Sequence, residues 1–589
     1  MSSEKISTLS SLTWSIAEIL RGDFKQSEYG KVILPFVVLR RLDCILAPTK
    51  NAVLAAYAAL PEGIDDVTRD YLLFQAAGGD LRVYNTSPLT FARIRTQQAT
   101  QLHDNLIAYI GGFSENVRDI FFDKFRFTDQ LKRLNDGGIL WQVFERFAQI
   151  DLHPNAVSNL EMGYVFEDLI RRFSEISNET AGEHFTPREV IRLMVNLLFI
   201  EDDAALTKPG VVRSLYDPTA GTGGMLSVAG EHLASLNPDA RLVMYGQELN
   251  PESYAICKAD MLIKGQDITN IVFGNTLSAD GLPGQHFDYM LSNPPFGVEW
   301  KSVELAVKDE REKRGFHGRF GAGLPAINDG SFLFLQHMIS KMRPEEQGGS
   351  RLAIVFNGSP LFTGGAGSGP SEIRRWIIEN DWLEGVVALP DQLFYNTGIS
   401  TYFWVVTNRK RPERRGKVQL VDARELWVKM RKSLGEKRKA ISPAQIEEIT
   451  RLYGAFEENE WVKIFRNEQF GYQRITVERP LRLRYTGEGA RERLEASKAF
   501  AKLDEAQQEA LLGSVGALAE LVTTDRAEAL AAAAAVNGRL SRVQEKALLE
   551  ALAVRDPNAP ALDEPDPELR DQENVPLPAE PVTFEPDPS

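Results

Sequence analysis

Between Val211 and Thr407, short runs of β-branched and aromatic residues alternate with amphipathic helical stretches such as Phe332–Met342 and Ser371–Asn380. Parallel strands need crossover connections, so this alternation predicts a doubly wound α/β domain: a mostly parallel, seven-stranded sheet with helices on both faces. No helix separates the last two runs, which predicts an antiparallel hairpin that closes the sheet edge. The expected strands are Val211–Tyr216, Leu242–Gly246, Ile271–Phe273, Phe287–Leu291, Leu352–Phe356, Gly385–Leu389 and Thr401–Thr407.

The segments on either side of this domain have a different pattern. Residues 1–180 alternate amphipathic stretches with loops and predict an N-terminal helical domain, followed by the α/β domain at 181–440. Residues 441–555 are rich in helix formers, as in the alanine run Ala529–Val536, and predict a mainly helical C-terminal region. The final segment, 556–589, contains nine prolines and few apolar residues, so we expect it to be disordered.

The negative net charge of the chain bears on whether it could bind nucleic acid by itself. Its net charge is −15, of which residues 556–589 carry −9, and the remaining −6 is still acidic. If the protein acts on DNA, we therefore expect much of the phosphate-neutralising charge to come from a partner subunit. The two cysteines, the lack of a long apolar run and the lack of a signal-like start indicate a cytoplasmic protein without a membrane span.

Two motifs follow predicted strands. The first, Asp217-Pro218-Thr219-Ala220-Gly221-Thr222-Gly223-Gly224, is a glycine-rich turn that lets the backbone approach a ligand at the carboxyl end of the sheet. Glu248 ends the next strand, where a carboxylate can accept both ribose hydroxyls of a nucleoside. The second motif, Asn293-Pro294-Pro295-Phe296, forms a rigid loop after a later strand. Asn275 follows the strand between them, so all four features share one sheet edge.

These motifs, in this order, resemble those of amino-methyltransferases of nucleic acids, and in particular the modification subunit of type I restriction–modification systems. Glu183–Val190 resembles the segment that closes over the methionine part of the cofactor in that family. Leu389–Ile399 resembles its loop near the target base, and the N-terminal segments Leu20–Gly22, Ile33–Phe36 and Leu39–Leu42 resemble its helical entry domain. Asn275 departs from the pattern, because an aspartate is common there.

The resemblance implies a class I S-adenosylmethionine-dependent methyltransferase fold and transfer of methyl to adenine N6 in double-stranded DNA. It also implies a complex in which two copies join one specificity subunit, with a motor–nuclease subunit completing the restriction enzyme. The implied catalytic residues are Asn293, Pro294, Pro295 and Phe296. The implied cofactor-binding residues are Glu183, His184, Phe185, Thr186, Pro187, Arg188, Asp217, Thr219, Gly221, Thr222, Gly223, Gly224, Glu248 and Asn275.

The chemistry explains the catalytic loop. The adenine amine is a poor nucleophile because its lone pair is delocalised into the ring. The side-chain oxygen of Asn293 and the carbonyl of Pro294 can accept its two N–H groups and expose the lone pair, without burying a charge. Phe296 can stack on a base flipped out of the duplex. Phe394 or Tyr395 can clamp the other side or simply pack in the core.

Several alternatives remain open at this level. Cytosine N4 and a protein glutamine amide suit the same loop, and the chain could be a catalytically silent scaffold. The basic cluster Lys308–Arg319 is either a solvated loop or a contact to DNA phosphates, whereas for Arg409–Arg415 the solvated loop is favoured. We expect no metal, since the seven histidines form no ligand pair. Cys257 is predicted to be a buried apolar residue rather than a nucleophile.

Overall fold

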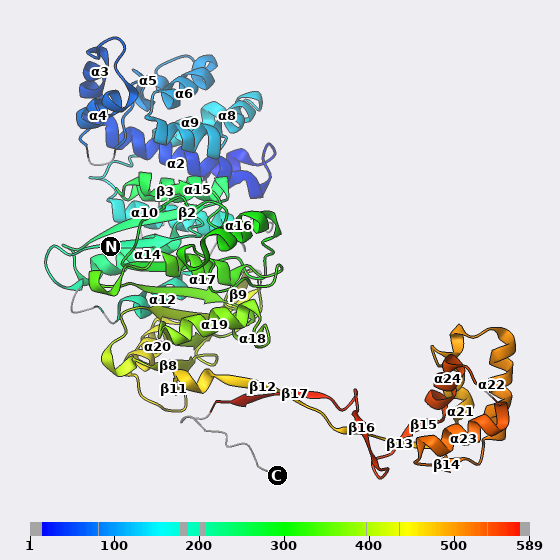
Figure 1. The fold of residues 1–589 in the computed structure, drawn as a ribbon. Coiled ribbons are helices and arrows are strands. Elements are labelled where there is room, and N and C mark those ends of the chain that lie inside the picture. The colour runs from blue at the N-terminus through cyan, green and yellow to red at the C-terminus, as the bar shows by residue number, and fades with distance from the viewer. Residues whose placement is uncertain are drawn as a thin grey trace. The chain divides into compact units, whose positions relative to one another are not determined.

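The computed structural model describes residues 15–577 except 80–81, 177–185, 201, 203–205, 396, 435 and 539. Figure 1 shows the chain, which divides into two compact units, Met1–Asn467 and Glu468–Ser589. None of the helices in the described ranges is long and apolar enough to cross a membrane.

The first unit begins with the expected helical region. Its central helix α2 is hydrophobic on nearly every side and is buried by its neighbours, which include α10 and, from the α/β domain, α15 (Figure 1). The helices of this region are α2 (Tyr29–Leu46), α3 (Lys50–Ala58), α4 (Asp66–Ala76), α5 (Phe91–Arg95), α6 (Leu102–Gly111), α7 (Glu115–Asp119), α8 (Phe127–Asp136), α9 (Leu140–Ala148) and α10 (Asn159–Ile176).

A nine-stranded sheet follows, in the order β11-β8-β6-β7-β5-β4-β1-β2-β3. All seven expected strands are present, but the predicted strand number was wrong because β8 and β11 extend the sheet beyond β6. The predicted hairpin β6–β7 is antiparallel, yet it does not close the edge: β7 lies between β5 and β6. The strands are β1 (Val212–Asp217), β2 (Arg241–Glu248), β3 (Ile271–Phe273), β4 (Tyr289–Ser292), β5 (Arg351–Phe356), β6 (Leu383–Ala388), β7 (Tyr402–Thr407), β8 (Lys417–Asp422) and β11 (Val462–Arg466).

Helices cover both faces of the sheet, as predicted. Every residue of the central strand β5 is buried, and its side chains alternate between the two faces. Ala353 and Val355 belong to the large core shared with α12, whereas Phe356 meets Phe332 of α17 on the opposite face. The helices around the sheet are α12 (Arg188–Phe199), α14 (Gly224–Leu236), α15 (Pro251–Ile263), α16 (Glu304–Arg314), α17 (Ser331–Ser340), α18 (Ser359–Phe362), α19 (Gly369–Glu379) and α20 (Pro443–Ala455).

The first unit extends beyond the predicted boundary at residue 440. Helix α20 packs against α12, and β11 pairs with β8, so the chain up to about 467 belongs with the sheet. A hairpin of β9 (Val428–Leu434) and β10 (Lys437–Ala440) precedes α20.

The second unit has its own core around Tyr485, Leu511 and Leu548. Its helices are α21 (Ala490–Glu495), α22 (Glu505–Ala517), α23 (Arg526–Asn537) and α24 (Arg542–Leu552), so the alanine run is helical as predicted. Its strands are β12 (Tyr472–Val477), β13 (Pro480–Thr486), β14 (Val522–Thr523), β15 (Ala553–Arg555), β16 (Ala561–Pro565) and β17 (Asp571–Pro576).

The expectation of disorder from residue 556 was wrong for the part of this segment that the structure describes. Strand β17 pairs along its whole length with β12, and β16 pairs with β13. Arg555 binds the carboxylate of Asp566 at 2.9 Å through two of its nitrogens. Backbone pairing and this bidentate contact order a segment whose composition offers little apolar surface. Residues 578–589 lie outside the described residues.

Candidate active site

The glycine-rich turn joins β1 to α14 at the carboxyl edge of the sheet. Gly221 and Gly223 have φ angles of +53° and +83°, which glycine adopts without the steric cost of a Cβ. A Cβ on Gly223 would also lie 2.9 Å from the sulfur of Cys257. Cys257 is fully buried, and burial raises the pKa of its thiol, so it is the apolar packing residue that the sequence predicted.

Asp217 ends β1 and is buried beneath the turn. Burial raises the pKa of its carboxyl group to about 7; the backbone N–H of Thr219, which donates to it at 2.9 Å, acts in the opposite direction, and the negative charge of Glu248 adds to the rise. This carboxyl group therefore titrates near neutral pH, where a nearby positive charge would favour its ionised form.

Glu248 and Asn275 follow the next two strands of the same edge. The two carboxylate oxygens of Glu248 accept the N–H groups of Gly221 at 2.8 Å and Asn250 at 2.6 Å. The side-chain oxygen of Asn275 accepts the N–H of Leu277 at 2.9 Å, so it shapes its own turn. The hydroxyl of Thr276 donates to the carbonyl of Pro218 at 2.6 Å and ties this strand end to the glycine-rich turn.

Asn293 follows β4, the other neighbour of β1. Its amide nitrogen donates to the hydroxyl of Thr186 at 2.9 Å, a contact between residues 107 positions apart in the chain. Its side-chain oxygen is buried and has no hydrogen-bond partner among the described residues. A buried amide oxygen without a donor is costly, so this atom is a candidate acceptor for a ligand.

The rest of the catalytic loop is partly open. Pro294 is buried and Pro295 exposed, while the half-buried ring of Phe296 meets Phe394 edge-on, with centroids 5.8 Å apart. Phe394 is 2% exposed and belongs to the hydrophobic core, which favours the packing role over the clamp.

The segment that was predicted to close over the cofactor is described only in part. Glu183, His184 and Phe185 lie outside the described residues. Pro187 caps the N-terminus of α12, and Arg188 in its first turn binds Glu231 of α14 at 2.5 Å. Arg188 therefore anchors this helix to the one that follows the glycine-rich turn.

Arg319, from the first basic cluster, contacts the chain just after Asn275 and a buried histidine. Its guanidinium binds Glu310 and donates to the carbonyls of Thr276 and Leu277. It also donates to Nδ1 of the buried His337 at 3.2 Å, which leaves the ring proton on Nε2, 3.0 Å from the hydroxyl of Tyr216. Burial, with the charge of Arg319, lowers the pKa of His337 to about 3, so the ring stays neutral.

Other side chains of the first cluster remain exposed on α16. Lys308 and Lys313 pair there with Glu304 and Asp309, each one turn away on the same helix.

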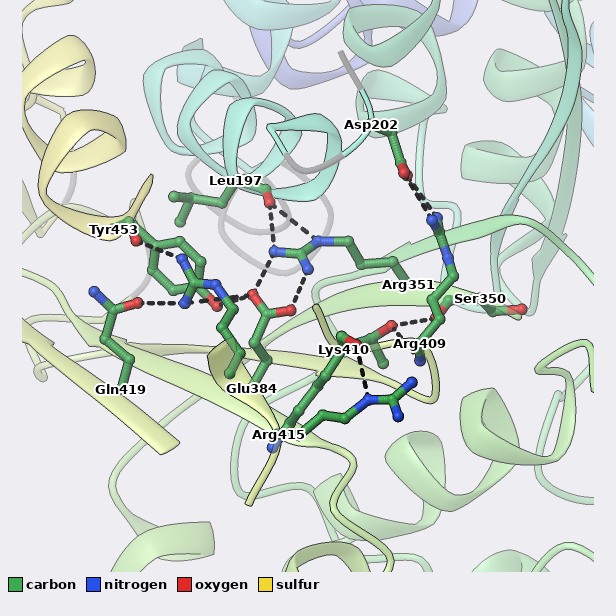
Figure 2. Close-up of polar contacts among 12 residues, drawn as sticks. Leu197, Asp202, Ser350, Arg351, Glu384, Arg409, Lys410, Arg415, Gln419 and Tyr453 are labelled. Atoms are coloured by element: carbon green, nitrogen blue, oxygen red, sulfur yellow. Dashed lines mark hydrogen bonds and ion pairs between the residues drawn. The ribbon is translucent and has the colours of Figure 1, made fainter. Parts of the chain in front are cut away.

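The solvated loop that was favoured for the second basic cluster is wrong for Arg409, Lys410 and Arg414, whereas Arg411 and Arg415 are exposed as expected. Figure 2 shows these side chains in polar contacts at the amino end of the sheet. Arg414 is 2% exposed and donates to Gln419 and to the carbonyl of Tyr453, and Arg409 binds both oxygens of Asp202. These contacts are structural and lie at the opposite end of the sheet from Asn293.

Arg351 stands at the centre of the same network (Figure 2). Its guanidinium lies between the carboxylate of Glu384 and the carbonyl of Leu197, in the last turns of α12. A cation at a helix C-terminus is favourable, and Tyr453 donates to Glu384 at 2.7 Å to complete the pairing. The network fixes one end of α12, whose other end carries Thr186 beside Asn293.

The sheet contains the strand order β3-β2-β1-β4-β5-β7-β6. A glycine-rich turn follows β1, a carboxylate ends β2 and Asn-Pro-Pro-Phe follows β4. Together these features define a class of enzyme. It is that of the S-adenosylmethionine-dependent methyltransferases that act on amino groups. Comparison with known proteins narrows the class. The family model of N-6 DNA methylase matches residues 158–471, and that of the HsdM N-terminal domain matches residues 9–147. The chain belongs to the N-6 DNA methylase family and is an adenine-specific DNA methyltransferase of the type I restriction–modification kind.

Individual relatives agree with this assignment. The methylase subunit of the type I restriction enzyme MjaIX from Methanocaldococcus jannaschii is 24% identical over 456 residues, which cover 76% of this chain and 77% of that protein. The HindI methylase subunit from Haemophilus influenzae is 31% identical over 271 residues, 45% of this chain and 54% of the relative. A type I methyltransferase subunit from Streptococcus thermophilus shares the fold with a TM-score of 0.60 at 24% identity, over 79% of this chain and 96% of that one. These matches do not favour the cytosine, glutamine or scaffold alternatives.

Proposed function

We propose that the carboxyl edge of the sheet binds S-adenosylmethionine and that Asn293 presents the adenine amine to it. The observation that carries the proposal is the buried side-chain oxygen of Asn293, which has no hydrogen-bond partner among the described residues, while the amide nitrogen of the same side chain is already bound to Thr186. That contact fixes the amide so that its acceptor, and not its donor, faces the substrate.

The residues at this edge fit the cofactor. Gly221, Thr222, Gly223 and Gly224 leave room for close approach of the backbone at the N-terminus of α14. Each carboxylate oxygen of Glu248 already accepts one N–H and has a further lone pair for a ribose hydroxyl. Asp217 and Thr219, which are hydrogen-bonded to each other, lie at the start of the same turn. We assign the remaining predicted contacts to Asn275 at the adenine and to Glu183, His184, Phe185, Thr186, Pro187 and Arg188 at the methionine part.

The chain's own groups then prepare the target amine. The side-chain oxygen of Asn293 and the carbonyl of Pro294 accept its two N–H groups, which draws the nitrogen towards a tetrahedral geometry, and Phe296 stacks on the flipped base. Bound S-adenosylmethionine supplies an electrophilic methyl on a sulfonium. When bound, it would give that methyl to the amine held by Asn293 and Pro294 and would leave as the neutral thioether, while one amino proton would pass to solvent.

Transfer of labelled methyl to DNA tests the catalytic assignment. Asn293→Ala should abolish transfer while the affinity for S-adenosylmethionine, measured by calorimetry, stays within about twofold of wild type. Asn380→Ala removes an exposed asparagine at the end of α19 and serves as the matched control. Digestion of the product to nucleosides should yield N6-methyladenine. Unchanged transfer by Asn293→Ala would refute the role of the loop.

The assembly is also part of the proposal. We expect two copies of the chain to join one specificity subunit on double-stranded DNA in the cytoplasm, with a motor–nuclease subunit completing the restriction complex. The net charge of −15 supports a partner that contributes the basic DNA-binding surface. Light scattering of the chain co-expressed with a specificity subunit measures the stoichiometry, and methyl transfer by the chain alone, at the rate of the complex, would count against the need for a partner.

A further inference from the structure

Lys437 lies between the segment that is proposed to close over the cofactor and the loop near the target base. It opens β10, its side chain is 3% exposed, and its ammonium group reaches three acceptors. These are the carboxylate of Glu189 at 2.5 Å, the carbonyl of Leu393 at 2.8 Å and the carbonyl of Lys439 at 3.0 Å. All three N–H donors of the ammonium are therefore used.

The acceptors belong to separate parts of the site. Glu189 is in the first turn of α12, three residues after Thr186, which holds Asn293. Leu393 is in the loop 389–399, whose Phe394 packs on Phe296 of the catalytic loop. One buried cation thus joins the helix that follows the cofactor segment to the loop that faces the target base.

The hairpin β9–β10 holds the same loop by backbone contacts. The carbonyl of Gln392 accepts the N–H groups of Arg438 at 3.0 Å and Lys439 at 3.2 Å, and the N–H of Glu436 donates to Tyr395 at 3.0 Å. Gln392 has a φ angle of +57°, a left-handed conformation that costs free energy in a residue other than glycine and persists only where neighbours impose it. The hairpin that carries Lys437 therefore contacts the part of this loop from Gln392 to Tyr395.

The cost of burying Lys437 argues that the contact has a purpose beyond packing. Desolvation lowers the pKa of its ammonium, and the charge of Glu189 opposes that effect. Replacement of a buried ion pair by apolar residues is often neutral or stabilising, so stability alone does not explain the pair. The ammonium group of Lys437 instead links two segments of the proposed site, α12 through Glu189 and the loop 389–399 through Leu393.

We propose that Lys437 is a positioning residue that couples cofactor binding to capture of the target adenine. The inference rests on the proposed function of the two segments that it joins. Cofactor binding orders α12, and the contact between Glu189 and Lys437 transmits this ordering to the loop 389–399. Each ligand therefore binds more tightly when the other is already bound. Such coupling is reciprocal and typically changes affinity by about 5- to 150-fold.

Calorimetry on the complex with its specificity subunit measures this coupling. The probe is S-adenosylhomocysteine, so that no methyl moves during the titration, with and without a duplex that the complex methylates. In the wild type the duplex should tighten binding at least fivefold. In Lys437→Met that gain should fall below twofold, while affinity without DNA stays within twofold of wild type. A local packing defect would instead weaken binding equally in both titrations.

Two further variants complete the test. Lys429→Met removes an exposed lysine of the same hairpin, opposite Lys439, and should keep the full gain. If Lys437→Met does not fold, Glu189→Gln decides, because it removes the charge of the partner and should also reduce the gain. An unchanged gain in Lys437→Met and Glu189→Gln, or no gain in a wild-type complex that methylates DNA, overturns the inference and leaves the proposed function standing. A wild-type complex without methyl transfer overturns the proposed function itself.

Discussion

Replacement of Asp217 by asparagine tests the electrostatics of the buried carboxyl group beneath the glycine-rich turn. Burial raises the pKa of this carboxyl group from 3.8 to about 7. A carboxyl group whose pKa is higher in the folded state stabilises the fold fully below pH 3.8, and this contribution is lost as the pH rises through 7. At about 1.4 kcal/mol per pH unit, the loss amounts to about 4 kcal/mol. About 2.5 kcal/mol of it falls between pH 5 and pH 8.

Urea unfolding at pH 5 and pH 8 measures the effect. All eight tryptophans precede residue 468, so their fluorescence reports on the first unit alone. Relative to wild type, Asp217→Asn should gain about 2.5 kcal/mol in unfolding free energy on going from pH 5 to pH 8, because the amide stays neutral. Other titrating groups cancel in this difference.

Asp309→Asn, at an exposed aspartate of α16, is the control and should follow the wild-type profile. If wild type and Asp217→Asn show parallel pH profiles, Asp217 is ionised throughout this range. In that case the hydrogen bond from Thr219, and not burial, dominates the pKa of this carboxyl group.

The remaining predictions concern three other contacts. Thr186→Val should lower kcat for methyl transfer about tenfold, because the amide of Asn293 loses its anchor, whereas Thr186→Ser should retain most activity; equal rates for both variants would contradict this. Arg351→Met should lower the urea-unfolding free energy by about 3–5 kcal/mol, because the buried Glu384 loses its bidentate partner and keeps only Tyr453 and the more distant Arg414. The double variant Arg351→Met/Glu384→Leu should recover part of that loss. If its loss of unfolding free energy equals the sum of the losses of the two single variants, Arg351 and Glu384 do not stabilise each other. Gly223→Ala should weaken cofactor binding and cost about 1–3 kcal/mol, owing to its positive φ and the clash with a buried sulfur, and a fully stable variant would show that the turn can rearrange.

The sequence was enough to find the central strands of the sheet, for a physical reason. Strands such as Arg351–Phe356 are buried on both faces and therefore consist of a nearly unbroken apolar run. Strands β8 and β11 were missed because Lys417–Asp422 and Val462–Arg466 mix charged with apolar residues near the edge of the sheet. Strands β16 and β17 were missed because their acidic, proline-rich composition conceals pairing that depends on backbone hydrogen bonds.

In the candidate site, too, some features could be predicted from the sequence and others could not. Glycines that need positive φ and an asparagine before two prolines are visible in the sequence, because the local backbone demands them. The contact of Asn293 with Thr186 and the position of Lys437 between two segments depend on tertiary packing. No local pattern marks Lys437, which stands in a basic hairpin among other lysines and arginines.

The ribbon of β12 and β17 determines how the second unit is connected to the chain. Val477 pairs directly with Asp571, so the chain enters and leaves residues 478–570 at adjacent points. Such a segment is a cassette: a short turn from 477 to 571 would remove it and leave both ribbon strands paired. A stop codon near residue 555, by contrast, would remove β17 and leave β12 without the strand it pairs with. Internal excision is thus the cleaner way to learn what this unit does, because it removes residues 478–570 and keeps the ribbon that holds the ends of the excised segment together.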